Sequence, residues 1–202
     1  RPRPSAVRAE RLRGNYLAGV NSLVNEQPDR ALEAFLRAAE LDGDTVETHF
    51  ALGSLYRRRG EVDRAIKIHQ NIAARESLEP AQREQASFAL GEDYFKAGLL
   101  DRAEVCFQQL IEHPTHRAAA LRNLLSIYEQ QGDWPQAVST YQHLASVASP
   151  EHPTALAHYY CEMAEQAQRE GSPAQATELL DKAFQAQRNF PIIFSAGENS
   201  VP

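Results

Sequence analysis

An all-α solenoid of helical hairpins is the fold class that this sequence predicts, and three observations predict it. A small residue recurs along the chain at intervals of 34, 38, 34 and 39 residues, and aromatic residues keep step with it. Proline and glycine fall where helices would begin and end. We expect about five helix-turn-helix hairpins that stack as a right-handed superhelix.

The recurring small residue is an alanine that anchors the second helix of each hairpin. Its five copies are Ala31, Ala65, Ala103, Ala137 and Ala176. The interval of 34 matches the tetratricopeptide-repeat (TPR) period, and the longer intervals need insertions around 77–79 and 149–154. The sequence therefore predicts a basic arm at 1–10, a five-repeat TPR domain at 11–190, and an unpatterned tail or stub of a sixth repeat at 191–202.

Two further columns indicate close packing inside each hairpin. Gly19, Gly53 and Gly91 stand twelve residues before the anchor, where a small residue lets two helices approach. Aromatic residues stand nine before or four after the anchor, and His69 takes the place of one of them. The residues interpreted as core are Tyr56, Tyr94, Tyr128, Phe35 and Phe107.

The expected helices follow from these columns and from their end signals. They cover 8–26 and 29–41, 45–59 and 62–76, 80–97 and 100–112, 115–131 and 134–147, then 151–170 and 173–188. Prolines at predicted helix starts are Pro28, Pro80, Pro135 and Pro173. Glycines at first-helix ends are Gly60, Gly98, Gly132 and Gly171. Glu26 breaks this last column, so we expect Asn25 to substitute as the cap.

Composition restricts the classes of partner. The 202 residues carry a formal charge of −6, which argues against binding to nucleic acid. The chain has no apolar run of about 18 residues, so we expect it to be soluble. The basic arm suits a membrane-proximal segment or a solvated terminus, and carries Arg1, Arg3, Arg8, Arg11 and Arg13. Two cysteines, placed in non-adjacent hairpins, suit a reducing compartment.

Residues that could carry catalysis or bind metal form no strong pattern. His113 and His116 flank a proline at a predicted turn without acidic or cysteine partners at ligand spacing, so we expect no metal site and no cofactor. His69 is expected to be a packing residue. His158 and Cys161 share a helix and leave a hydrolase as one alternative. Without a phosphate loop or a nucleophile elbow, we expect a protein that is not an enzyme.

The remaining candidate site is a groove lined by the first helix of each hairpin, at eighteen, fifteen, eleven and eight residues before each anchor. It lacks the Lys and Asn of a clamp for acidic peptides, so a partly apolar protein segment is the expected ligand. Packing of the aromatics against neighbouring helices is the alternative. The candidates are Tyr16, Val20, Leu23, Glu47, Phe50, Ser54, Arg57, Gln85, Phe88, Glu92, Phe95, Arg122, Ser126, Glu129, His158, Cys161 and Glu165.

Specific strings resemble the bacterial lipopolysaccharide assembly protein B family. The most specific is LGSLYRRRGEVDRAIKIHQ at 52–70, with YLAGVN at 16–21, DTVETH at 44–49, LGEDYFKAGLLDRAE at 90–104 and AHYYCEMA at 157–164. The resemblance implies a cytoplasm-facing repeat domain at the bacterial inner membrane of a Gram-negative bacterium. It also implies an N-terminal transmembrane anchor and a C-terminal rubredoxin-like zinc module, both expected to be missing from this fragment.

The same resemblance implies an adaptor that regulates lipopolysaccharide synthesis and assembly. Its implied partners are a membrane AAA+ protease, the lipid A pathway deacetylase that this protease degrades, and lipopolysaccharide assembly factors. Membrane contact would come only through the missing anchor, and a homodimer is left open. A generic TPR chaperone or assembly factor for another membrane complex is the alternative function.

Overall fold

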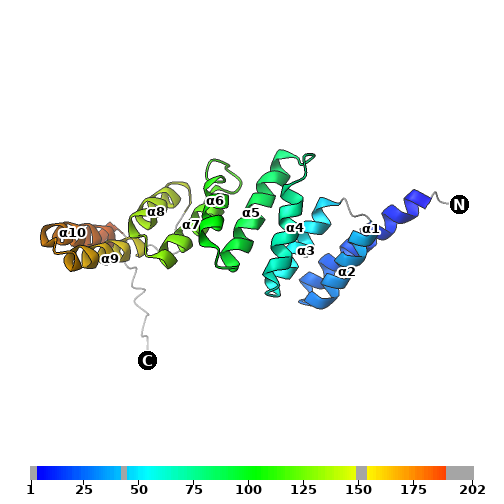
Figure 1. Ribbon diagram of the computed structural model, residues 1–202, viewed down its shortest axis with the longest axis horizontal. Coiled ribbons are helices and arrows are strands. Elements are labelled where there is room, and N and C mark those ends of the chain that lie inside the picture. Colours follow the sequence, from blue (N-terminus) through cyan, green and yellow to red (C-terminus); the bar gives the residue numbers. More distant parts are fainter. Residues whose placement is uncertain (1–3, 42–44, 149–153, 190–202) are drawn as a thin grey trace, which may run out of the picture. The chain divides into compact units, whose positions relative to one another are not determined.

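The computed structural model describes residues 4–41, 45–148 and 154–189, and within these ranges the secondary structure is helical (Figure 1). The predicted order of five hairpins is confirmed. The helices are α1 (Pro4–Val24), α2 (Pro28–Leu41), α3 (Val46–Arg58), α4 (Val62–Ala73), α5 (Pro80–Lys96), α6 (Leu100–Gln108), α7 (Arg117–Gln131), α8 (Trp134–Val147), α9 (Ala155–Arg169) and α10 (Pro173–Asn189).

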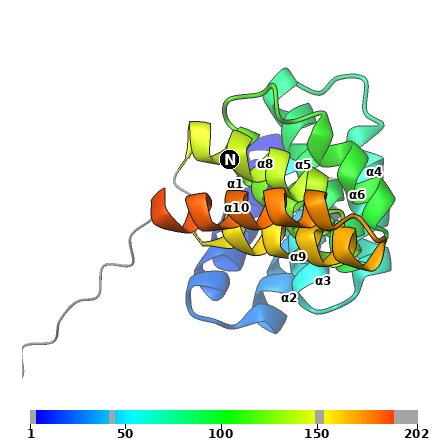
Figure 2. The same ribbon diagram turned by 90° about the vertical axis from the view of Figure 1, so that its left-hand side faces the viewer.

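The chain forms two compact units, residues 1–120 and 121–202, which divide within α7. In the first unit, the pairs α1–α2, α3–α4 and α5–α6 pack as hairpins, and α4 also packs against α5. In the second unit, α9 and α10 lie side by side as the fifth hairpin (Figure 2), and α8 packs against α9. The predicted TPR domain at 11–190 therefore comprises two compact units.

The prolines and glycines mark helix ends as the sequence predicts. Pro28, Pro80 and Pro173 are the first residues of their helices, and Pro135 is the second residue of α8. The four end glycines have φ values of +81°, +74°, +67° and +76°. An L-residue with a side chain adopts this left-handed backbone only at a cost, so glycine is favoured there.

The first hairpin turns differently from the prediction. Glu26 itself adopts the left-handed conformation, with φ of +54°, so the expectation that Asn25 takes over the cap is wrong. The Asn25 side chain instead donates a hydrogen bond from Nδ2 to the Asn21 carbonyl, at 2.9 Å. The turn needs a left-handed residue at this register whichever side chain occupies it.

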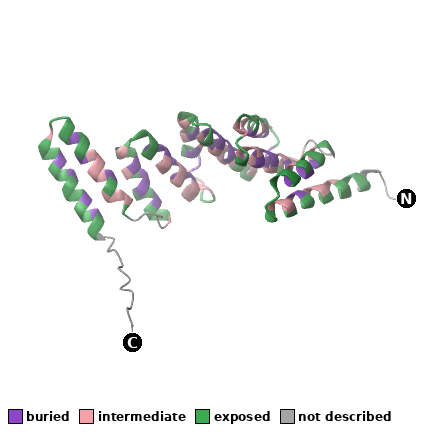
Figure 3. Ribbon diagram, turned by 90° about the horizontal axis from the view of Figure 1, so that it is seen from below, coloured by how far each residue is buried: buried purple, intermediate pink, exposed green. Residues whose placement is uncertain are grey.

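The core runs along the inner faces of the hairpins, shown in purple in Figure 3. The anchor alanines Ala31, Ala65, Ala103 and Ala137 are fully buried, as are Phe35 and Phe107. A Cβ on Gly19 would lie 2.7 Å from the Phe35 ring, and one on Gly91 would lie 2.7 Å from the Phe107 ring. These two columns therefore fit one another, because a glycine makes room for each aromatic ring. Tyr94 and Tyr128 are buried as predicted, whereas Tyr56 is only partly buried.

The structure describes part of the predicted arm. Residues 4–10 are the first turns of α1, so Arg8 lies on the same helix as Arg11 and Arg13 rather than on a separate segment. Residues 1–3 and the predicted tail at 191–202 lie outside the described residues. Among the described helices, none combines the length and the apolar character that crossing a bilayer requires.

Candidate functional site

The predicted groove residues lie on the first helices: α1, α3 and α5 in the first unit, and α7 and α9 in the second. We call this side of each first helix its groove face. The solvent-exposed candidates are Glu47, Gln85, Glu129, His158 and Glu165. The partly exposed ones are Tyr16, Val20, Leu23, Ser54, Arg57, Phe88, Glu92, Phe95, Arg122, Ser126 and Cys161.

Phe50 is the buried member of the set. Its side chain is 7% exposed and lies in a core cluster with Ile72, Leu78, Ala86 and Ala89. This places Phe50 between α3 and α5, where it packs the hairpins together, so its assignment to the binding face is wrong. The reason is the small residues of α5, which allow α3 to approach closely enough to cover the ring.

A charged cluster joins the second and third hairpins at the groove face. Arg57 on α3 donates from Nη2 to Glu92 at 2.7 Å and from Nη1 to Asp93 at 2.7 Å. Its Nη1 also lies 3.3 Å from the Ala89 carbonyl. His69 on α4 bonds the other carboxylate oxygen of Asp93 through Nδ1, at 2.5 Å. One guanidinium and one imidazole thus hold two adjacent carboxylates of α5.

Burial differs sharply across this cluster. The side chains of Asp93 and His69 are fully buried, that of Arg57 is 17% exposed, and that of Glu92 is 36% exposed. Burial raises the pKa of the Glu92 carboxyl and nearby Asp93 raises it further, whereas the Arg57 guanidinium lowers it; the net direction is upward. Glu92 is therefore the solvent-facing end of a network whose other members lie in the core.

His69 occupies the column that holds Phe35 and Phe107 in neighbouring hairpins. Its ring lies against Gly53 as those rings lie against their glycines, with Nε2 at 2.4 Å from the position of a Cβ. Nε2 is buried and has no hydrogen-bond partner among the described residues. His69 therefore packs like the predicted core residue, but it also binds Asp93 from the next hairpin.

The two aromatic candidates on α5, Phe88 and Phe95, are described by their ring contacts and their exposure. The Phe88 ring packs edge-on against Phe107 at 5.6 Å between centroids and stacks on His116 at 5.3 Å. Phe95 lies two turns further along α5 and is also partly exposed. Glu92 lies between them in sequence, so spacings of four and three residues place the three side chains on one face of α5.

On α1 the candidates pack largely within the first hairpin. The Tyr16 ring lies edge-on to Phe35, with centroids 5.6 Å apart. Val20 and Leu23 pack against the core cluster that contains Phe35. A mostly apolar hollow of about 580 Å³ separates α1 from the start of α3, and its lining includes Tyr16 and Glu47.

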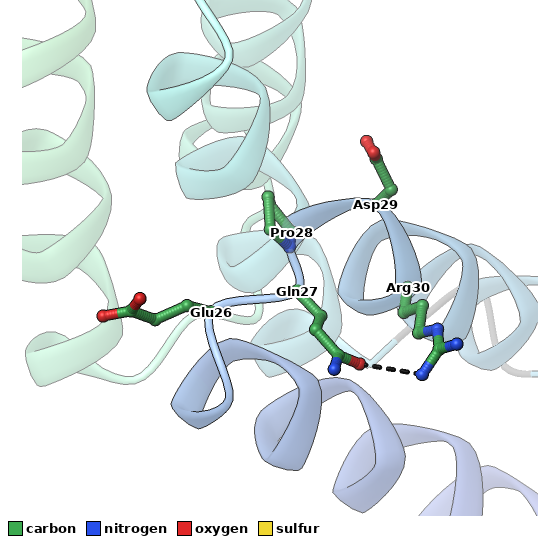
Figure 4. A pocket seen from close by; sticks show the side chains of 5 residues that line it. All are labelled: Glu26, Gln27, Pro28, Asp29 and Arg30. Carbon is green, nitrogen blue, oxygen red and sulfur yellow. Dashed lines mark hydrogen bonds between the residues drawn. The ribbon is translucent and has the colours of Figure 1, made fainter.

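A second hollow, of about 440 Å³, lies at the turn between α1 and α2 (Figure 4). It is lined by the consecutive residues 26–30. Gln27 accepts a hydrogen bond from Arg30 at 3.0 Å, and Asp29 forms an ion pair with Arg59 of the next hairpin. Its residues come from a single turn, so this hollow is shaped by the local backbone.

In the second unit, polar and aromatic side chains meet between α7, α8 and α9. Tyr159 is buried, and its hydroxyl donates a hydrogen bond to the exposed Glu129 carboxylate. Burial and this bond raise the pKa of Tyr159. Trp134 stacks on Tyr159 and meets His158 edge-on, both at 6.0 Å between centroids. The partly exposed Trp134, the exposed His158 and the Glu129 carboxylate thus surround the buried Tyr159 ring.

The candidate Cys-His pair has its own surroundings. Nε2 of His158 lies 3.8 Å from Glu162, one turn along α9, and the His158 side chain is 62% exposed. Cys161 is a partly buried free thiol on the same helix, and Cys106 is a partly buried free thiol on α6. His158 thus lies near Glu162 and Trp134.

His113 and His116, in the segment between α6 and α7, also have separate partners. Nδ1 of His113 lies 2.9 Å from the Glu84 carboxylate of α5, and His116 stacks on Phe88. Within the part of the chain that the structure describes, no three His, Cys, Asp or Glu side chains converge as a metal site.

Sequence reasoning missed Asp93, Tyr159 and Trp134. For Asp93, one signal in the sequence is the histidine in an aromatic column, because a buried imidazole needs a hydrogen-bond partner from a neighbouring helix. Trp134 precedes the stretched interval near 149–154 and Tyr159 follows it, so their contact spans the interval, where the repeat register does not predict which residues meet.

Comparison with known proteins places these features in a family. The sequence model of the tetratricopeptide repeat matches residues 16–79 and 88–153. Lipopolysaccharide assembly protein B of Escherichia coli strain K12 is 42% identical over 181 residues, which cover 90% of this chain and 46% of that protein. The protein of the same name from Haemophilus influenzae is 33% identical over 185 residues, which cover 87% and 46%. The chain spans about half the length of these curated relatives.

Solved structures agree on the fold. A crystal structure of MamA superposes with a TM-score of 0.64 at 20% identity, covering 90% of this chain and 94% of that one. YrrB, described as a TPR protein with an unusual peptide-binding site, gives 0.58 at 22% identity, covering 85% and 84%. At such identities the likeness shows the fold alone. The relatives' identities confirm the family resemblance of the chain, and the family match, over more than half of the residues, shows that this chain belongs to the tetratricopeptide-repeat family.

Proposed function

We propose that this chain is a non-enzymatic adaptor in lipopolysaccharide assembly, which binds other proteins through its groove faces. The observation that carries the proposal is the 42% identity to lipopolysaccharide assembly protein B along 90% of the chain. The repeat fold supports it, because stacked hairpins present extended surfaces for protein segments.

The groove faces offer the chemistry that such binding needs. On α5, Phe88 and Phe95 provide partly exposed aromatic surface, and Glu92 provides a charge held in place by Arg57. Aromatic side chains with few rotamers and fixed charges favour specific protein binding. The side chains considered for catalysis, His158 and Cys161, fit the same use, because His158 is exposed beside Trp134.

The finer mechanism that we propose is recruitment for proteolysis. The chain would bind the deacetylase of the lipid A pathway and bring it to a membrane AAA+ protease at the cytoplasmic face of the inner membrane. This step limits lipopolysaccharide synthesis by lowering the amount of deacetylase. No group on the chain has to make or break a covalent bond for this role.

A pull-down with the immobilised 202-residue chain tests the proposal. We expect the purified deacetylase and the protease each to be retained, and both to be retained together when mixed. The chain heated to unfolding and then immobilised is the control for non-specific capture. Retention of neither protein by the folded chain contradicts the proposed recruitment.

A further inference from the structure

The charged cluster at the groove face of the first unit has two carboxylates and one guanidinium. Arg57 binds both Glu92 and Asp93 at 2.7 Å, and His69 binds Asp93 at 2.5 Å. The cluster therefore sets two carboxylates against one permanently charged guanidinium.

The two carboxylates differ in how far they reach solvent. Asp93 is fully buried, whereas the Glu92 side chain is 36% exposed. Arg57 cannot turn away to serve Glu92 alone, because it also holds Asp93 and lies against the Ala89 carbonyl. Glu92 thus presents a carboxylate of fixed position that a cation of a partner can approach from solvent.

The surroundings of Glu92 add to the same pattern. Phe88 and Phe95 share its face of α5 and are partly exposed. The neighbouring helix α3 packs against α5 and carries exposed Glu47 at its start, within 3.3 Å of the Gln82 side chain. Across this face of the first unit, aromatic surface therefore alternates with negative charge.

We propose that the face formed by α3 and α5 binds a partner segment that places a Lys or Arg against Glu92 and apolar side chains against Phe88 and Phe95. The proposal rests on the proposed function, since it names the chemistry of the segment that the adaptor holds. Charge complementarity selects this occupant. An acidic segment would add a third carboxylate beside two that already share one guanidinium.

Matched peptides added to the full chain test this inference. The probe is a short amphipathic peptide of Leu, Phe and Ala with two central lysines, and its counterparts carry Gln or Glu in place of the lysines. Affinities are measured by fluorescence anisotropy at low and at physiological salt. We expect the Lys peptide to bind best and the Glu peptide worst, with roughly tenfold between the Lys and Gln peptides.

Two variants separate a specific contact from general attraction by an acidic protein. Glu92→Gln is expected to abolish the preference for the Lys peptide. Glu33→Gln is the matched control, because Glu33 is an exposed second-helix carboxylate and its loss changes the net charge equally. The control variant is expected to keep the preference.

Three outcomes overturn the inference. They are equal loss of the preference in both variants, tighter binding of the Glu peptide, and the absence of binding by all three peptides. The pull-down of the deacetylase keeps the two proposals apart. If that protein is retained while the peptides show any of these outcomes, the adaptor function stands and the assigned segment chemistry is wrong.

Discussion

Removing the Asp93 carboxylate should strongly destabilise the first unit. Asp93 is fully buried and binds both Arg57 and His69. Asp93→Ala leaves a guanidinium that is only 17% exposed with a single carboxylate partner, and a buried imidazole Nδ1 with none. Breaking a buried charged pair by removing one partner costs about 3–5 kcal/mol. The retained Glu92 contact places the expected loss near the lower end, about 3 kcal/mol.

A second substitution tests the cause of that loss. His69→Phe in the Asp93→Ala background removes the orphaned imidazole and restores the residue that this column carries at Phe35 and Phe107. Gly53 provides the space, as the equivalent glycines do for those rings. We expect the double variant to recover about 1–3 kcal/mol, the usual penalty for a buried unpaired polar group.

Urea unfolding followed by far-UV circular dichroism measures both changes, with Asp181→Ala as the control because Asp181 is exposed on α10. The control should change the unfolding free energy by less than about 0.5 kcal/mol. A loss below about 1 kcal/mol for Asp93→Ala, or a double variant less stable than the single one, would refute the reasoning.

Three further predictions concern the turns, the helix contacts and pH. Glu26→Gly should stabilise the chain by about 1 kcal/mol, because Glu26 has a φ of +54° that glycine adopts more easily. Gly98→Ala should destabilise the chain by a similar amount, because Gly98 has a φ of +74°. Thermal unfolding measures both changes. Gly91→Ala should cost about 1–3 kcal/mol in urea, because its Cβ would lie 2.7 Å from the Phe107 ring, and Phe107→Leu in the same chain should return part of the loss. The raised pKa of Glu92 means that the folded state binds the proton more tightly than the unfolded state. The contribution of Glu92 to stability is therefore present at low pH and lost as the pH rises from about 4.5 through the folded pKa. Over that rise, the Glu92→Gln variant should gain stability relative to the parent chain. A difference in unfolding free energy between the two chains that stays constant with pH would contradict the upward direction of the shift.

The repeat period made most of the fold predictable. The observed helices start at Pro28, Pro80 and Pro173, as predicted, because proline at the first helical position loses no hydrogen bond. The turns at Gly60 and Gly98 match because glycine adopts positive φ without steric cost. Glu26 shows the limit of this reasoning, since the turn geometry is imposed by packing of the hairpin even without glycine.

The site was less predictable because it depends on contacts between hairpins. The spacing from the anchor predicts that Arg57 and Glu92 belong to one surface, and the structure brings them into contact, but no sequence rule revealed that Asp93 beside them lies in the core. Phe50 has the same spacing as Phe88, yet the small residues opposite it on α5 bury its ring. Which member of a column remains exposed is decided by the partner helix, whose residues lie more than thirty positions away in the sequence.

The affinity of the purified lipid A pathway deacetylase for the chain tests the central claim most directly. Isothermal titration is performed with the parent chain, with Phe95→Ala, and with Val105→Ala as the control, because Val105 is an exposed apolar residue of the second helix α6. The adaptor account predicts saturable binding by the parent chain, at least roughly tenfold weaker binding by Phe95→Ala, and unchanged binding by Val105→Ala. Equal binding by all three chains would contradict the assignment of the groove face, and no binding by the folded parent chain would contradict the adaptor function itself.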